Sequence, residues 1–484
     1  MKKMRLIGVM LLIGIALCSS KCGKDPDNPT PSTGKEYDLG DGSNEYEIRE
    51  NTTLTYPNKY NLKGFVYVKE GVTLTIEPGV IIKGDKATKA TLIVERGAKL
   101  MARGTKDRPI VFTSAQDAGR RKPGDWGGII LLGKARNNQG EQTIEGGVRS
   151  KHGGINDADE SGVLSYLRCE FAGIEYSTDN EINGITFGSV GSGTIVDHVQ
   201  VSCSGDDSFE WFGGCVNAKH LVAFCGWDDD FDTDNGFSGK VQFAVSIRDP
   251  KVGDKSASNG FESDNDPNGS SAMPATGAVF ANISFFGPVY NPSAYADEAG
   301  VRGSSVDARF QAAAHLRRNT QQSVFNSLFA GFPVGLIIEN NGKGDAQGNA
   351  DRGELNVANC IMAGCVKNFQ DKQVWTNQSQ YDNAENSDAF VKTYFERSNG
   401  GNRTFATLAD LKLSGNSNPL SNLANPNIFL NSDSPLKTGA AWTHPKVTSG
   451  FEKVNYIGAF SPSETVSSNW MSGWTNFDPQ NTAY

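Results

Sequence analysis

Acidic residues recur at a regular spacing in the middle of this 484-residue chain. Residues 203–214 align with residues 225–236 at an offset of 22, and a third copy begins at Phe261, 30 residues after Phe231. Repeats of this kind are typical of solenoids, in which each turn stacks on the previous one. Equivalent side chains of stacked strands lie about 4.8 Å apart, so the repeats predict a ladder of carboxylates beside a column of phenylalanines.

This ladder predicts a cation site, because like charges stacked on one another are unfavourable. Ca²⁺ is the natural ion, since it takes about six to eight oxygen ligands in flexible geometry. The run that begins at Asp230 is not an EF-hand loop, because Gly236 comes one position late and Val241 replaces the bidentate glutamate. The candidate ligands are the acidic residues of the repeats: Asp207, Glu210, Asp229, Asp230, Asp232, Asp234, Glu262 and Asp264.

The elements that would carry the ladder are short strands. In residues 65–84 and 90–100, β-branched residues alternate with other residues and are punctuated by glycine, with no helical period between them. Related strands recur at 167–173, 281–287 and 358–364. These patterns predict an all-β fold, a parallel β-helix. A six-bladed propeller is the alternative, but its repeats would be about twice as long.

The sequence resembles right-handed parallel β-helix proteins of pectate-lyase-like architecture over about residues 60–370. The resemblance rests on Leu-Thr-Ile-Glu-Pro-Gly-Val at 74–80, Arg-Pro-Ile-Val-Phe-Thr-Ser at 108–114, and Asp-Trp-Gly-Gly-Ile from Asp125. It implies a single-stranded solenoid, and by itself it implies no particular activity.

Two kinds of enzyme on this fold suggest catalytic roles. Polysaccharide lyases hold Ca²⁺ with aspartates and use a lysine or arginine as the base. β-Helical glycosidases use paired carboxylates, and Asp206 and Asp207 resemble the aspartate pair of polygalacturonases. The Gly-His-Gly and Arg-x-Lys motifs of that family are absent in the expected order. The basic candidates are Arg248, Lys251, Arg317 and Arg318.

Other side chains near the ladder are candidates for ligand contact. Trp211 and Trp227 suit stacking on a sugar, and Arg318 suits an anionic ligand, whereas an inward-facing tryptophan would belong to the core. His198 and His220 are expected to stack in register as structural residues. The ladder itself leaves three interpretations open: a solvated acidic face, a cation site without catalysis, and a catalytic site.

Composition narrows the choice of partners. The chain has 46 basic and 55 acidic residues, a net charge of −9, which argues against nucleic acid. It has 55 glycines and no long apolar helices, which argues against a helical bundle or a multi-span membrane protein. The cysteines match no zinc spacing and are too few for a disulfide scaffold, although a Cys203–Cys225 bridge stays open.

The N-terminus resembles a bacterial lipoprotein signal, and a plain cleaved secretory signal with an incidental cysteine is the alternative. Lys2, Lys3 and Arg5 precede an apolar run at 6–17, which is too short for a membrane-spanning helix. Cys22 is the preferred lipidation site, because the polar residues after it form a tether, and Cys18 is the alternative.

Four segments follow from these patterns: a signal peptide at 1–21, a flexible tether at 22–45, a parallel β-helix at 46–370 and a C-terminal cap at 371–484. The expected protein is a surface-exposed outer-membrane lipoprotein, held by its lipid anchor. It would bind a glycan or nutrient, or act in adhesion, without catalysis and through an acidic, calcium-binding face. A polysaccharide or an outer-membrane uptake complex is the expected partner. The alternatives are a calcium-assisted polysaccharide lyase or glycoside hydrolase, and a purely structural scaffold.

Overall fold

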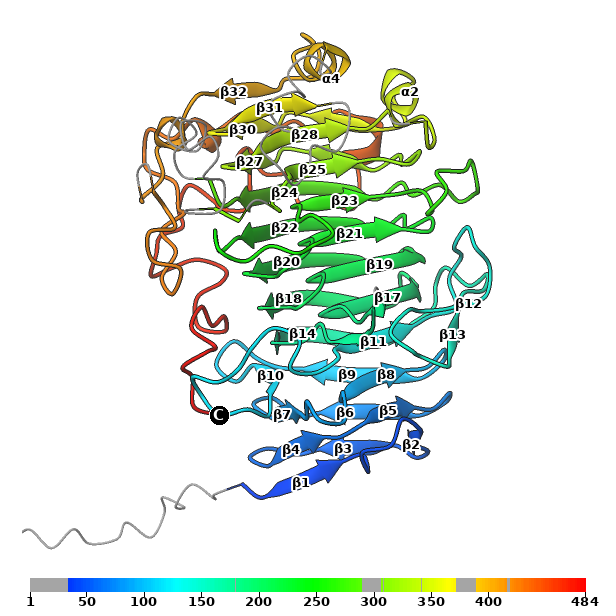
Figure 1. Ribbon diagram of the computed structural model, residues 1–484. Helices are drawn as coiled ribbons and strands as arrows, with labels where there is room; N and C mark the ends of the chain where they lie inside the picture. The colour runs from blue at the N-terminus through cyan, green and yellow to red at the C-terminus, as the bar shows by residue number, and fades with distance from the viewer. Residues whose placement is uncertain are drawn as a thin grey trace, which may run out of the picture. The chain divides into compact units, whose positions relative to one another are not determined.

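Parallel strands stack turn upon turn in two long sheets (Figure 1). The computed structural model describes residues 34–178, 180–289, 306–307, 309–340, 342–370, 389–415 and 418–484. The signal peptide, most of the tether, and Cys18 and Cys22 lie outside these residues, as do residues 371–388 of the expected cap. The predicted parallel β-helix is confirmed.

One sheet, here called sheet B, carries the acidic repeats. In the described part of the chain its strands are β2 (Tyr46–Ile48), β5 (Phe65–Val68), β8 (Thr91–Val94), β11 (Ile129–Leu132), β17 (Ile185–Val190), β19 (Phe209–Gly214), β21 (Phe231–Asp234), β23 (Phe261–Ser263), β25 (Ala312–Leu316), β28 (Val334–Ile338) and β31 (Lys367–Gln370). Phe209, Phe231 and Phe261 occupy successive rungs, and their buried rings lie 5.6 and 5.9 Å apart. Because side chains alternate between faces, the acidic residue after each phenylalanine points out of the core.

The other sheet, sheet A, is bent along a corner. Among the described residues it contains β1 (Glu36–Leu39), β3 (Thr52–Leu54), β4 (Lys59–Leu62), β6 (Thr73–Ile76), β7 (Ile81–Gly84), β9 (Lys99–Arg103), β10 (Ile110–Ser114), β14 (Gly162–Glu170), β18 (Ile195–Ser202), β20 (Asn217–Phe224), β22 (Lys240–Ile247), β24 (Val279–Phe286), β26 (Ser323–Phe325), β27 (Leu328–Ala330), β29 (Asn356–Ala358), β30 (Ile361–Ala363) and β32 (Arg403–Phe405). Strand β14 pairs with β9 before Tyr166 and with β10 after it.

The corner is made by residues with a left-handed backbone. Tyr166, His198, His220 and Phe243 have φ of 47°, 57°, 53° and 58° and stand at equivalent places in β14, β18, β20 and β22. A positive φ turns the chain and removes the residue from the alternation of the strand. We call these four residues the corner column. The expected stacking of His198 on His220 is confirmed, with ring centroids 4.2 Å apart.

Small elements complete the turns. Two antiparallel hairpins are formed by β12 (Gln142–Thr143) with β13 (Lys151–His152) and by β15 (Glu175–Ser177) with β16 (Asn180–Glu181). In the described segments the helices are α2 (Ala346–Asp351), α4 (Ala389–Phe395), η1 (Leu408–Leu411), η2 (Pro435–Lys437) and η3 (Pro445–Val447). No helix in the described segments is long and apolar enough to cross a membrane.

The ends of the β-helix differ from the expected boundaries. Strand β1 pairs in parallel with β4, so the first turn begins inside the segment expected to be a flexible tether. At the other end β32 pairs with β30, so the turns continue past residue 370. Helix α4 then packs Val391, Tyr394 and Phe395 into the core near β28 and β31, as a cap would.

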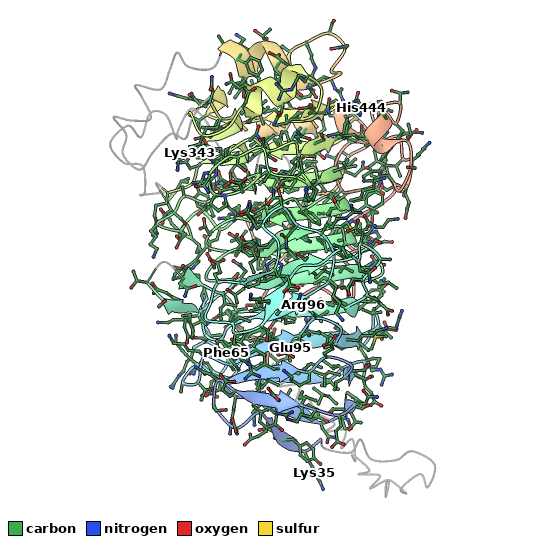
Figure 2. The ribbon with its side chains drawn as sticks, turned by 90° about the vertical axis from the view of Figure 1, so that its right-hand side faces the viewer. Lys35, Phe65, Glu95, Arg96, Lys343 and His444 are labelled. Carbon is green, nitrogen blue, oxygen red and sulfur yellow. The ribbon has the colours of Figure 1, made fainter. Side chains whose placement is uncertain are left out.

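Most of the expected cap lies along the outer face of sheet A instead. This segment, residues 418–484, is here called the strap. Beside the last turns, where Figure 2 labels His444, the Ala441 amide donates to Asn326 Oδ1 at 2.9 Å. Among the early turns, Arg121 Nη1 donates to the Pro479 carbonyl at 2.6 Å. The strap covers apolar side chains that sheet A turns outward, and together they form a second hydrophobic cluster.

The six cysteines in the described residues are all free thiols, so the Cys203–Cys225 bridge is not formed. Cys203 and Cys225 occupy equivalent places in adjacent turns, at the ends of β18 and β20. Burial raises the pKa of the Cys203 thiol to about 12. Both residues therefore behave as small apolar residues.

Candidate functional site

An acidic cavity of about 520 Å³ opens over the outer face of sheet B. Its basic lining residues are Lys255, Arg317 and Arg318. Its ten acidic lining residues are Glu145, Glu181, Asp206, Asp207, Glu210, Asp228, Asp229, Asp232, Asp254 and Glu262. Ten carboxylates and three basic groups give the lining a formal charge of −7 when all are ionised.

The centre of the cavity is the predicted ladder. Glu210 on β19, Asp232 on β21 and Glu262 on β23 stand on successive rungs, as the offsets of 22 and 30 residues predicted. The turns that enter these strands add a second row of carboxylates. The Asp229 amide donates to Asp207 Oδ1 at 2.8 Å, so this row also bonds one turn to the next.

Three groups of carboxylates converge closely enough to share ions. In each group, one oxygen per residue lies within 4.8 Å of the others. Asp207 belongs to the first two groups and Asp232 to the last two, which makes these two residues central to the cavity. The groups are Asp206 with Asp207 and Asp228, Asp207 with Glu210 and Asp232, and Asp229 with Asp232 and Glu262.

Burial and mutual repulsion make these carboxyl groups hold protons strongly. Burial, with Asp254 next in effect, raises the pKa of Asp228 to about 8. Burial and the neighbouring Glu181 raise the pKa of Glu145 to about 7. Burial and the neighbouring Asp206 raise the pKa of Asp207 well above the usual range, and burial and the neighbouring Glu262 do the same for Asp232. Ionising the group at neutral pH therefore calls for compensating positive charge.

Three oxygens at the cavity accept no hydrogen bond from the described residues. They are Asn183 Oδ1, Asp228 Oδ1 and Asp232 Oδ1, and all three are shielded from solvent. Asn183 is 1% exposed, and its Nδ2 donates to Glu210, which leaves its carbonyl oxygen without a partner. Carboxylate and amide oxygens are the ligands that Ca²⁺ prefers, so the donor set fits this ion.

The two arginines of the cavity are bound to carboxylates. Arg317 donates from Nε and Nη2 to the two oxygens of Asp264 at 2.8 and 3.0 Å, and it also pairs with Glu262. Arg318 Nη1 donates to Asp264 Oδ2 at 2.7 Å. Although burial opposes it, Glu262 and Asp264 hold the pKa of Arg317 well above its usual range. Arg317 is therefore a cationic group here and not a base.

Several predicted site residues lie outside the lining of the cavity. Asp230 and Arg248 are both 0% exposed and form an ion pair of 2.9 Å inside the turn, so Asp230 is no ligand of the cavity and Arg248 no base. Asp264 is held by the two arginines, and neither Asp264 nor Asp234 lines the cavity. Lys251 does not line it either.

The two tryptophans differ from each other. Trp211 is 0% exposed, with its ring stacked on Phe187 at 5.5 Å and on Phe237 at 5.2 Å. It is a core residue, so the prediction of a sugar contact was wrong. Trp227 is 39% exposed and precedes Asp228, which lines the cavity. Trp227 is thus accessible, but it does not itself line the cavity.

Apart from Asp228, which belongs to the repeat at 225–236, seven lining residues were not predicted from the sequence. Glu145 comes from the loop of the β12–β13 hairpin, Glu181 from β16, Asn183 from the segment before β17, and Asp254, Lys255, Ser256 and Ala257 from the loop between β22 and β23. Asn183 lies two residues before Ile185, as Asp207 lies two residues before Phe209, so the pairing of β17 with β19 places it one turn before Asp207. The other segments lie between the strands of the two long sheets, where no repeat aligns them with the ladder.

Stacked parallel sheets and an acidic cavity on one of them define the class of protein as a parallel β-helix with a candidate cation site. The family model described as "Pectate-lyase like beta helix domain" matches residues 46–408, and the chain belongs to this family. No curated protein and no solved structure matches the chain significantly.

Proposed function

We propose that this protein binds an anionic glycan in the acidic cavity, with Ca²⁺ as part of the binding site, and does not cleave it. The observation that carries the proposal is the convergence of shielded, unpartnered oxygens with the carboxylates of the ladder. Bound Ca²⁺ would neutralise these carboxylates and attract the acidic groups of a uronate-containing glycan. Arg318, a quarter exposed at the same cavity, supplies a second cationic contact.

The basic residues argue against a lyase. Elimination requires a group that accepts a proton, and Glu262 and Asp264 keep Arg317 protonated. Arg248 is enclosed with Asp230 outside the cavity. Neither of these arginines is thus available as the base, and the lysine of the lining, Lys255, is in an ion pair with Glu181 at 3.4 Å. The cavity therefore offers cationic contacts for an anionic ligand, which favours binding over β-elimination.

Glycan binding in Ca²⁺ is expected to be selective for uronate-containing polysaccharides. On an array of acidic and neutral polysaccharides, binding should disappear in EDTA. Arg318→Gln should weaken it about tenfold, because a hydrogen bond to a charged group contributes about 1.5–3 kcal/mol. Arg352→Gln removes an exposed arginine outside the cavity and should leave binding unchanged. Calcium-independent binding, or new unsaturated ends in the polysaccharide, would contradict the proposal.

A glycoside hydrolase is the second candidate. The raised pKa values of Glu145 and Asp228 favour it, because a carboxyl group that stays protonated near neutral pH suits a general acid. The same array, scored for new reducing ends, separates the two candidates. Reducing ends that disappear in Asp228→Asn would establish the hydrolase.

We also propose that a lipid on Cys22 anchors the protein to the outer membrane, where residues 23–33 would act as a tether. The charged start, the apolar run and the cysteine at its end support this. After cell fractionation, the wild type and Cys18→Ser should remain with the membrane, and Cys22→Ser should be released. Retention of Cys22→Ser with release of Cys18→Ser would move the anchor to Cys18. The anchored protein could then present its ligand to an uptake complex in the same membrane.

A further inference from the structure

The acidic cavity offers ligands to more than one ion. Its first and third converging groups have no residue in common. The second group lies between them, because it shares Asp207 with the first and Asp232 with the third. One ion in the first group and one in the third would therefore not compete for a carboxylate.

The first and third groups have the same layout and lie one turn apart. Each takes two carboxylates from one turn of the β-helix and one from the next turn. In the first group, Asp206 and Asp207 precede β19 and Asp228 precedes β21. In the third group, Asp229 and Asp232 belong to the turn of β21 and Glu262 belongs to β23. Because neighbouring strands are about 4.8 Å apart, ions held in this way would lie about 5 Å apart along the axis.

The dimensions of each group suit Ca²⁺. The ion binds oxygen at about 2.3–2.6 Å, so two ligands on opposite sides of it are about 4.6–5.2 Å apart. In each group the three oxygens lie within 4.8 Å of one another, so one ion can contact all of them without movement of the strands. Asp207 Oδ1 also accepts the Asp229 amide, but a carboxylate has lone pairs for both partners.

Each of the two groups contains an oxygen that is shielded from solvent and accepts no hydrogen bond from a described residue. These oxygens are Asp228 Oδ1 in the first group and Asp232 Oδ1 in the third. A shielded acceptor without a partner is costly, and an ion in each group would give both oxygens a partner. Asn183 Oδ1, on a side chain that is 1% exposed, is a third such oxygen and lies one turn before Asp207. Because Asn183 carries no charge, it indicates a ligand independently of the acidic groups.

The charge of the lining exceeds what a single ion can balance. With all groups ionised, ten carboxylates and three basic groups give −7. One Ca²⁺ would leave −5 and two would leave −3. If one group stayed empty, its carboxylates would still repel one another in a shielded site. A second ion removes this repulsion.

We propose that the acidic cavity binds two Ca²⁺ ions, one in the first group and one in the third. This inference rests on the proposed function, which makes Ca²⁺ the ion of the cavity. The first ion joins the turns of β19 and β21, and the second joins the turns of β21 and β23. Asp207 and Asp232 also belong to the middle group, so each lies beside both ions. An anionic glycan would then meet two cationic centres in place of one.

Ca²⁺ titration of the full chain, after removal of bound ions with a chelator, tests the number of ions. Calorimetry of the wild type is expected to show two equivalents. Asp206→Asn changes the first group only and Glu262→Gln the third only, so each should lower the affinity for one ion at least about tenfold and leave the other bound. Asp117→Asn, an exposed carboxylate outside the cavity, should keep both ions.

The outcomes separate this inference from the proposed function. One equivalent in the wild type, or loss of both ions in either single variant, would overturn the two-ion site and leave calcium-dependent glycan binding in place. No bound Ca²⁺ at all would overturn both.

Energy transfer between lanthanide ions gives a readout on the wild type that does not depend on how the variants fold. Tb³⁺ and Eu³⁺ prefer oxygen ligands, as Ca²⁺ does, and Tb³⁺ passes its excitation to Eu³⁺ only when the two ions are close neighbours. With one equivalent of each ion, excitation of Tb³⁺ is expected to produce Eu³⁺ emission and to shorten the Tb³⁺ lifetime. An unchanged Tb³⁺ lifetime with both ions bound would place them far apart and overturn the proposal.

Discussion

Replacement of Asp232 by asparagine is expected to raise the melting temperature of the cation-free protein at pH 8. Ca²⁺ should raise the melting temperature of the wild type, and Asp232→Asn should lose most of this response. Asp232 belongs to two of the three converging groups and has a shielded, unpartnered oxygen. Without a cation its charge repels Glu262 and Asp264, so an amide of the same shape relieves that repulsion. With a cation the same charge is a ligand, so its loss weakens binding.

The size of the Ca²⁺ effect follows from mass action. An ion that binds only the folded state stabilises it by about 2.7 kcal/mol at a concentration of about 100 Kd. For a protein of this size, with an entropy of unfolding of about 2.1 cal/mol/K per residue, that corresponds to a rise of about 3 °C. Thermal unfolding of the wild type and Asp232→Asn, each in EDTA and in Ca²⁺, measures both effects. Asp117→Asn, which changes an exposed carboxylate outside the cavity, should respond to Ca²⁺ as the wild type does.

The pH dependence has a defined sign. The pKa of Glu145 is about 7 and that of Asp228 about 8 in the folded protein, against about 4 in an unfolded chain. Below about pH 4 both states are protonated, and between about pH 4 and pH 8 the unfolded chain binds fewer protons than the folded one. Stability in EDTA should therefore fall as the pH rises through this window, and Ca²⁺ should offset the fall. A cation-free wild type that keeps its stability from pH 5 to pH 8 would contradict this account of the cavity.

Replacement of Arg248 by alanine is expected to lower the free energy of unfolding by about 3–5 kcal/mol. Arg248 and Asp230 are both fully buried, and Ser246 donates the other hydrogen bond to Asp230. Removing the guanidinium leaves a buried carboxylate without its counter-charge, which is far more costly than the loss of an exposed pair. Urea denaturation of the wild type and Arg248→Ala gives the difference.

A double variant serves as the control for this pair. Arg248→Met combined with Asp230→Asn removes both charges, so it should recover most of the lost stability. Both proteins should keep the response to Ca²⁺, because neither residue lines the acidic cavity. A loss below about 1 kcal/mol, the range of an exposed pair, would show that the pair is not buried as described. Loss of the Ca²⁺ response in the double variant would show that Asp230 is a Ca²⁺ ligand.

The sequence was sufficient to predict the ladder because two periodicities act together. The offset between repeats sets which residues share a rung, and the alternation within a strand then sets which side chains face out. The neighbouring Asp230 keeps the offset, since it aligns with Ser208, but its side chain is buried. It lies in the turn before β21, where the direction of a side chain depends on local geometry. Its partner, Arg248, follows β22 on the other sheet, and only the folded chain brings the two together.

Residues that reach the cavity from outside the repeat could not be predicted. Glu145 lies in an irregular segment whose path depends on packing against several turns at once. Asn183 is in register with Asp207, but the residues around it differ from the repeat at 203–214, so the sequence did not reveal that register. The course of the strap was hidden for the same reason, since its residues carry no period. The strap packs on apolar side chains that point outward from sheet A. These side chains cannot be recognised from the alternation pattern until the strands have been assigned to the two sheets.

The strap changes how the β-helix can come apart. A solenoid in which each turn contacts only its neighbours can fray from its ends one turn at a time. Here Arg121 is bonded to a residue 358 positions later in the chain, and Gln200 to one 276 positions later. Early turns, although made first, gain these contacts only after the last residues of the strap have been synthesised. Docking of the strap on sheet A is therefore expected to be a late step of folding. Its detachment would expose the outer faces of many turns at the same time.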